Sequence, residues 1–182
     1  MVRRGRHDRR RSAAGGRVTK PGARMAARFR SASAEWATPD DLFRELDRAF
    51  RFTLDVAATY ENRKCDRYFN RETDGLTQEW RGRIWCNPPY GRRVGEWLKK
   101  ARQEVDAGRS DVAVFLLPAR TDTKWFHQWI WDQTQHQARP GVELRLVPGR
   151  LKFNGAATSA PFPSLIAVLT THHHDSLGTN GD

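Results

Sequence analysis

Two stretches of the chain place apolar residues on one face of a helix. The first helix is expected to begin after Thr38 as the N-cap, with Pro39 at the first helical position and two aspartates in the first turn. The second is expected at 94–105, with Gly108 ending it. The apolar faces consist of Leu42, Phe43, Leu46, Ala49 and Phe50 in the first helix and Val94, Trp97, Leu98, Ala101 and Val105 in the second.

Apolar runs around these helices predict the strands. Residues 52–56 and 84–86 are short runs, and 111–117 is a continuous run, as at the buried centre of a parallel sheet. Residues 142–147 alternate like a half-buried strand, and 164–170 is expected to be the last strand. Strands alternating with helices predict an α/β fold with a doubly wound sheet, in a single domain at 35–170 with a flexible C-terminus at 171–182.

Two regions leave alternatives open. The aromatic-rich stretch 124–131 is interpreted as a helix that packs on the sheet, and its polar interleaving leaves contact with a nucleic acid or support of a bound base as the alternative. Residues 60–80 have no clear period; Cys65 among them is expected to be small and buried. Four apolar side chains there either line a slot for a planar ring or cover the sheet edge, namely Tyr68, Phe69, Leu76 and Trp80.

The positive charge of the chain is concentrated at its start. The whole sequence has a net charge of +11, and residues 1–34 contain eleven Lys and Arg against Asp8, a net of +10, which leaves +1 for the rest. Few large apolar residues occur there, so a disordered basic tail is expected at 1–34. It is either an arm that seeks phosphates, a transit peptide, or a solvated extension with Met25 as the true start.

Composition excludes several other classes. Two distant cysteines form neither a disulfide framework nor a metal-binding spacing, which fits a reducing cytosol. No apolar run approaches the length of a membrane span. The three histidines at 172–174 have no Cys or carboxylate set around them, so no metal site is expected.

The strongest chemical signal is Asn87-Pro88-Pro89-Tyr90, a loop that follows the apolar run 84–86. An amine conjugated to a planar ring is a poor nucleophile, and two fixed acceptors would free its lone pair. The Asn87 side-chain oxygen and the Pro88 carbonyl are suited to this task, and Tyr90 offers a face on which a base can stack. A rigid turn is the alternative, but a turn does not need an aromatic at the fourth position.

With these residues, the chain resembles the phage-type DNA N6-adenine methyltransferases, which use S-adenosylmethionine. The resemblance covers roughly residues 34–170 in the family's order. It is carried by the tetrapeptide together with segments 35–39, 54–58, 62–65, 74–76, 117–120, 149–153 and 161–164. It implies a Rossmann-like sheet of the S-adenosylmethionine-dependent methyltransferase type, and a phage or prophage enzyme that acts in the bacterial cytoplasm.

The resemblance also implies a cofactor site. The segment with Trp36, Thr38 and Pro39 borders the methionine end of the cofactor in the family. Asp55 is expected to hold the cofactor's ammonium group or a water, and otherwise caps a helix. Ala57 stands where many methyltransferases have glycine, so the general dinucleotide-binding fingerprint is missing.

Further contacts are expected with the cofactor ring and with DNA. Asp74 is placed by the resemblance against the cofactor adenine or ribose, with an Asp-Gly turn as the alternative. DNA phosphates are expected at Arg92 and Arg93 after the catalytic loop and at Arg120 and Lys124 after the strand at 111–117. Two alternatives stay open: methylation of another planar amine, such as an RNA base or a protein glutamine, and an inactive DNA-binding module.

Overall fold

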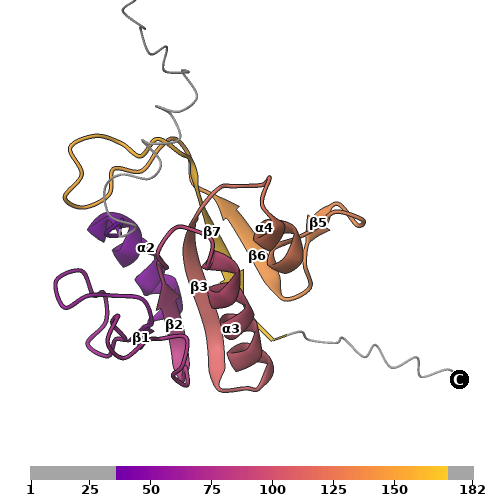
Figure 1. Ribbon diagram of the computed structural model, residues 1–182, viewed down its shortest axis with the longest axis horizontal. Helices are drawn as coiled ribbons and strands as arrows, with labels where there is room; N and C mark the ends of the chain where they lie inside the picture. Colours follow the sequence, from indigo (N-terminus) through magenta and orange to yellow (C-terminus); the bar gives the residue numbers. More distant parts are fainter. Residues whose placement is uncertain (1–35, 172–182) are drawn as a thin grey trace, which may run out of the picture. The chain divides into compact units, whose positions relative to one another are not determined.

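The computed structural model describes residues 36–171 (Figure 1). Within this range a five-stranded sheet has the order β1-β2-β3-β7-β6. Its strands are β1 (Leu54–Asp55), β2 (Gly82–Cys86), β3 (Ser110–Pro118), β6 (Val142–Leu146) and β7 (Ser164–Leu169). The predicted basic tail at 1–34 and the three histidines at 172–174 lie outside the described residues.

The sheet is mixed rather than parallel throughout. β1, β2 and β3 are parallel to one another, whereas β7 runs antiparallel to both β3 and β6. Residues 111–117 were expected to lie inside a parallel sheet, and this expectation is wrong for the side of β3 that pairs with β7. β3 is central in the sheet and buried from Val112 to Pro118. The carboxyl ends of β1 and β2 meet at one edge, which is where open α/β sheets bind ligands.

Helices cover both faces of this sheet, as predicted. α2 (Asp40–Phe50) packs on one face and α3 (Val94–Asp106) on the other. Side chains alternate along β3, so Val114 and Leu116 belong to the α2 side while Phe115 and Leu117 belong to the α3 side. These observations give the fold class: a Rossmann-like doubly wound α/β sheet in a single domain.

The predicted helices differ from the observed ones in two details. All five residues expected on the apolar face of α3 are buried, but Ala49 in α2 is exposed. Thr38 is not the N-cap of α2, since Pro39 occupies that position and makes no side-chain capping bond. Thr38 is buried and its hydroxyl is used elsewhere, as described below.

α4 (Lys124–Trp129) confirms the interpretation of the aromatic-rich stretch as a helix packed against the core. Phe126 is buried, and the half-buried Trp125 and Trp129 pack against the same cluster as α3. A short hairpin follows, formed by β4 (Trp131–Asp132) and β5 (Gln137–Ala138), which the sequence pattern did not predict. Figure 1 shows α4 beside α3.

The loop between β1 and β2 contains two further corrections. Cys65 was expected to be buried, but it is only half-buried. Of the two uses considered for the apolar residues at 68–80, covering the sheet edge is the one observed. Trp80 is buried, donates from Nε1 to the Gly75 carbonyl at 2.7 Å and stacks on Trp97 at 6.1 Å between ring centroids.

Two kinds of feature are absent from residues 36–171. None of the helices in this range has the length and apolar character needed to cross a membrane. The same residues contain no cluster of three or more His, Cys, Asp or Glu side chains placed to hold a metal ion.

Candidate active site

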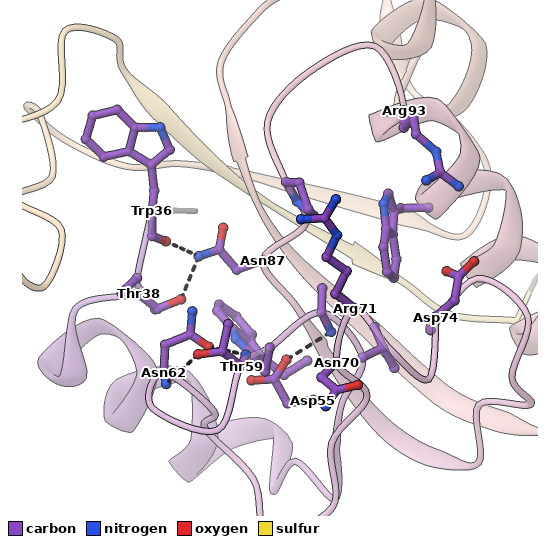
Figure 2. A pocket seen from close by; sticks show the side chains of 18 residues that line it. Trp36, Thr38, Asp55, Thr59, Asn62, Asn70, Arg71, Asp74, Asn87 and Arg93 are labelled. Carbon is purple, nitrogen blue, oxygen red and sulfur yellow. Dashed lines mark hydrogen bonds between the residues drawn. The ribbon is translucent and has the colours of Figure 1, made fainter. Parts of the chain in front are cut away.

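A pocket of about 480 Å³ lies at the carboxyl ends of β1 and β2 (Figure 2). This volume falls in the range of small-molecule sites, roughly 300–1,000 Å³. Four segments line it: 36–38 before α2, 55–62 after β1, 70–75 in the following loop, and 85–97 from β2 into α3. Of the predicted site residues, the lining includes Trp36, Thr38, Asp55, Ala57, Asp74, Asn87, Pro89 and Arg93.

The amide of Asn87 is held in one orientation. Its Nδ2 donates to the Trp36 carbonyl and to the Thr38 hydroxyl, the latter at 3.0 Å. The flipped amide would place Oδ1 against the Trp36 carbonyl, which is also an acceptor, so the network selects this orientation. Thr38 therefore positions Asn87 across 49 residues of sequence instead of capping α2.

The other end of the same amide has no protein partner. Asn87 Oδ1 is inaccessible to water and accepts no hydrogen bond from any residue in the described part of the chain. A buried carbonyl oxygen without a donor costs roughly 1–3 kcal/mol. Asn87 lines the pocket, so this unpaired oxygen lies next to the cavity and needs an explanation.

Asp55 is a buried carboxylate at the end of β1. Its Oδ2 accepts from the Lys64 backbone N–H at 3.0 Å and its Oδ1 from that of Ala57 at 3.3 Å. Burial raises the pKa of Asp55 to about 6, and the two N–H donors and the charge of Lys64 only partly oppose this effect. A cation bound next to this carboxylate would stabilise its ionised form and lower its pKa.

Asp74 and Gly75 shape the opposite wall of the pocket. Asp74 has a left-handed backbone (φ 46°), and its Oδ1 accepts from the Leu76 N–H at 3.2 Å, so the residue does form a turn. It also lines the pocket, on the same side as Arg93 in Figure 2. At Gly75 an added Cβ would lie 2.2 Å from the Val56 carbonyl oxygen, so only glycine allows this loop to approach β1 so closely.

The tetrapeptide Asn87-Pro88-Pro89-Tyr90 lies partly in the pocket lining and partly in the core. Pro89 lines the pocket and Pro88 is buried, while Tyr90 is not among the lining residues. The Tyr90 ring packs edge-on against Phe162 at 5.6 Å and against Phe153 at 6.2 Å, and its hydroxyl donates to the Leu116 carbonyl at 3.4 Å. Burial raises the pKa of Tyr90 well above its usual value. The predicted stacking of a base on Tyr90 stays a prediction.

The predicted DNA contacts occupy three places. Arg93 lines the pocket and pairs with Glu96 at 2.9 Å. Arg92 and Lys124 line a separate groove between α3 and α4. Arg120 is exposed and lines neither cavity, and Pro39, predicted near the cofactor, is buried at the start of α2 outside the pocket lining.

Sequence reasoning missed several polar residues of the pocket. Asn62 lines it and accepts from the Thr59 N–H at 2.6 Å, and Asn70 lines it and accepts from two N–H groups of its own loop. Arg71 also lines the pocket. Asn62 lies in segment 62–65, which carried the family resemblance, so that resemblance could have pointed to it as a site residue. Asn70 and Arg71 lie in the stretch 60–80, where apolar residues have no regular spacing and gave no such signal.

Comparison with known proteins identifies the family of this chain. The profile of the family described as "DNA N-6-adenine-methyltransferase (Dam)" matches residues 28–165. The chain is 33% identical to the DNA N-6-adenine-methyltransferase of Escherichia phage T1 over 94 residues, which is 50% of this chain and 38% of that protein. It is 35% identical to the DNA N-6-adenine-methyltransferase of Haemophilus phage HP1 over 94 residues, which is 50% of this chain and 53% of that protein.

These matches cover about half or less of the curated relatives. Among solved structures, the crystal structure of the 23S rRNA methyltransferase ErmE is similar with a TM-score of 0.49 and 11% identity, over 76% of this chain and 70% of that one. A likeness of that degree is too slight to support an assignment. The family match spans most of the chain, including the whole tetrapeptide and the pocket. The chain belongs to the DNA N-6-adenine-methyltransferase (Dam) family.

Proposed function

We propose that this protein transfers a methyl group from S-adenosylmethionine to the N6 amine of adenine in DNA. The observation that carries the proposal is the free, buried Oδ1 of Asn87. The amide is held through its nitrogen, so its oxygen is left without a protein partner and would accept from a ligand donor once the groups that cover it move aside. The N6 amine of adenine is such a donor, and an acceptor fixed in place before binding needs no reorganisation during the reaction.

The cofactor fits the chemistry of the pocket. Bound S-adenosylmethionine would supply the methyl group from its positively charged sulfonium centre. Asp55 offers the carboxylate for the ammonium of its methionine part, and Asp74 lies across the pocket for its ribose or adenine. The mixed polar and apolar lining suits a molecule with a charged end and an aromatic end.

The protein's part in the reaction is positioning. Asn87 Oδ1 accepts one N–H of the target amine, and the Pro88 carbonyl is the proposed second acceptor. Together they would draw the amine's lone pair out of conjugation with the ring and direct it at the methyl group that bound S-adenosylmethionine would supply. The amine loses its proton to water after transfer, so no protein base is required. In duplex DNA the adenine must first be flipped out, at a cost of a few kcal/mol.

The names of two phage relatives support the proposed substrate and cellular location. The two phage proteins are named for DNA adenine methylation. We propose that the protein acts in the cytosol of a bacterium that carries the phage or prophage gene. Other planar amines, in RNA bases or in protein glutamine, are the alternative acceptors, and cofactor binding without methyl transfer to DNA would favour them.

The test measures transfer of labelled methyl from S-adenosylmethionine to unmethylated duplex DNA, followed by nucleoside analysis. N6-methyladenine is expected with the wild type. Asn87→Ala is expected to lower turnover by at least about 100-fold, the effect of losing one fixed hydrogen-bonding group at a reacting centre, while cofactor affinity stays within a few-fold. Equal losses of turnover and cofactor binding would make Asn87 structural.

Two Thr38 variants test the orientation of the amide in the same assay. Thr38→Val removes the hydroxyl that accepts from Asn87 Nδ2 at nearly constant volume. We expect it to lower kcat by about tenfold, the worth of one hydrogen bond, with a smaller change in KM. Thr38→Ser keeps the acceptor and is expected to restore most of kcat. If Ser and Val variants lose activity equally, the hydroxyl does not act through Asn87.

A further inference from the structure

The groove between α3 and α4 has the composition of a nucleic-acid contact. Its volume is about 340 Å³, and its lining includes the cations Arg92, Lys99 and Lys124 together with the indoles of Trp125 and Trp129. None of these three cations has an ion-pair partner within residues 36–171, in contrast to Arg93. Three unpaired cations beside two aromatic surfaces indicate that the groove binds a polyanion that also has apolar groups.

The one acid in the groove lining is already neutralised. Glu96 accepts from Arg93 Nε at 2.9 Å, and this contact raises the pKa of Arg93. The groove therefore has an excess of positive charge that no protein group in the described part of the chain offsets. A phosphate backbone complements it, because phosphate contacts supply most of the sequence-independent affinity for DNA.

The groove adjoins the proposed active site through two consecutive residues. Arg92 lines the groove, while its neighbour Arg93 lines the pocket that contains Asn87. Both follow Tyr90 and Gly91 at the end of the catalytic tetrapeptide. A strand whose adenine enters the pocket therefore passes Arg92 on leaving it, and the groove continues from there along α3 and α4.

Close helix packing forms the floor of the groove. A Cβ added at Gly95 would lie 3.2 Å from Trp125 Cβ and 3.9 Å from Trp129 Nε1, so glycine lets α4 approach α3 at this point. Trp125 and Trp129 remain half-buried, with part of each indole lining the groove. Such surfaces suit the apolar faces of a deoxyribose or a base beside the phosphates.

We propose that this α3–α4 groove binds the DNA backbone next to the flipped adenine, with Arg92, Lys99 and Lys124 as its phosphate contacts. The proposal rests on the proposed function for the identity of the polymer. It adds Lys99 and the two indoles to the DNA-contacting residues, and it gives the strand a path from the pocket toward α4.

The experiment compares two double variants that remove the same charge. Lys99→Gln/Lys124→Gln removes two cations from the groove, and Arg44→Gln/Arg48→Gln removes two exposed cations from α2 on the opposite face of the sheet. Affinity for a short unmethylated duplex is measured by fluorescence anisotropy across a salt series. Cofactor affinity and thermal unfolding of each variant show that the fold is intact.

The groove variant is expected to bind DNA about tenfold more weakly, with the slope of log K against log salt reduced by about 2, since each phosphate contact contributes about 0.9. The α2 variant is expected to change neither quantity beyond the effect of net charge. Equal effects of the two variants would overturn the proposal, and so would a wild type that does not bind DNA. A wild type that binds DNA through the groove but transfers no methyl group would refute the proposed reaction alone.

Discussion

At the scale of single residues, the raised pKa of the Asp55 carboxyl group predicts that cofactor binding depends on pH. Burial raises its pKa to about 6, so it is ionised above that pH and protonated below it in the empty pocket. If the ionised form holds the cofactor's ammonium group, the affinity for S-adenosylmethionine is expected to fall by about tenfold per pH unit below about pH 6 and to level off above about pH 7. Calorimetric titration from about pH 5 to about pH 8 measures this.

Asp55→Asn is the matched variant for that titration. It keeps a side-chain acceptor for a backbone N–H but cannot ionise, so its cofactor affinity is expected to be lower at neutral pH and independent of pH in the same interval. A wild type without this pH dependence, or a variant that retains it, would show that Asp55 does not contact the cofactor's charge.

Thr38 shows why residue roles are harder to predict than elements. Thr38-Pro39-Asp40-Asp41 is a strong local signal for a helix start, and a helix does start at Asp40. The hydroxyl, however, bonds to Asn87, which is 49 residues away in sequence. Local preference predicted the helix, but the partner of a side chain depends on the tertiary fold, which brings segment 36–38 against the end of β2.

At the scale of elements, the approach of the 70–75 loop to the end of β1 shapes the pocket. Gly75→Ala would place a methyl group 2.2 Å from the Val56 carbonyl oxygen, and backbone on one side must move to relieve this. We expect the substitution to lower the free energy of unfolding by about 2 kcal/mol and Tm by roughly 4 to 8 °C, with weaker cofactor binding. Thermal unfolding with and without cofactor measures both.

Gly91→Ala is the control for that substitution. An added Cβ at Gly91 meets no atom within 4 Å, and this backbone does not have the positive φ that favours glycine. Its Tm is expected to stay within about 2 °C of the wild type, since substitutions without clashes change stability by about 0.5 kcal/mol. Equal losses of stability in the two variants would mean that loss of glycine, rather than contact with β1, is responsible.

Helices and strands with a marked apolar pattern could be predicted from the sequence. The direction of a strand and the short hairpin depend on which strands pair with each other, and they could not be predicted. α3 follows its apolar stripe, and β3 follows a continuous apolar run. The antiparallel direction of β7 was not predictable, because a buried strand has the same composition in either direction. The β4–β5 hairpin has two-residue strands and a positive φ at His136, so it is too short to produce a period.

At the scale of the whole molecule, most of the net positive charge lies in residues 1–34 of the sequence. The residues after 34 have a net charge of only +1, and the proposed reaction depends on a few oriented dipoles and one carboxylate within them. The sequence predicted the strand-end position of the tetrapeptide. It did not predict the α3–α4 groove, because Arg92, Lys99 and Lys124 are brought to one surface only when the two helices pack together.

Removal of residues 1–27 tests whether the basic N-terminal segment acts as a separate arm. These residues contain nine Lys and Arg and one Asp, a net of +8, and they precede the family match at 28–165. The truncated protein is expected to bind duplex DNA more weakly, with the slope of log K against log salt reduced by at least about 2. Turnover at saturating DNA and affinity for the cofactor are expected to stay near those of the full chain, because residues 36–97 supply the pocket.

A chimeric protein separates the effect of the charge of residues 1–27 from the effect of their length. Replacing residues 1–27 by a Gly/Ser segment of the same length should reproduce the weakened binding and the reduced salt slope of the truncation, because a neutral segment releases no counterions from DNA. Normal affinity in this chimera would mean that the segment contributes through its length and not its charge. A folded truncated protein that binds cofactor but has no turnover would instead make residues 1–27 part of the catalytic unit and refute a separable arm.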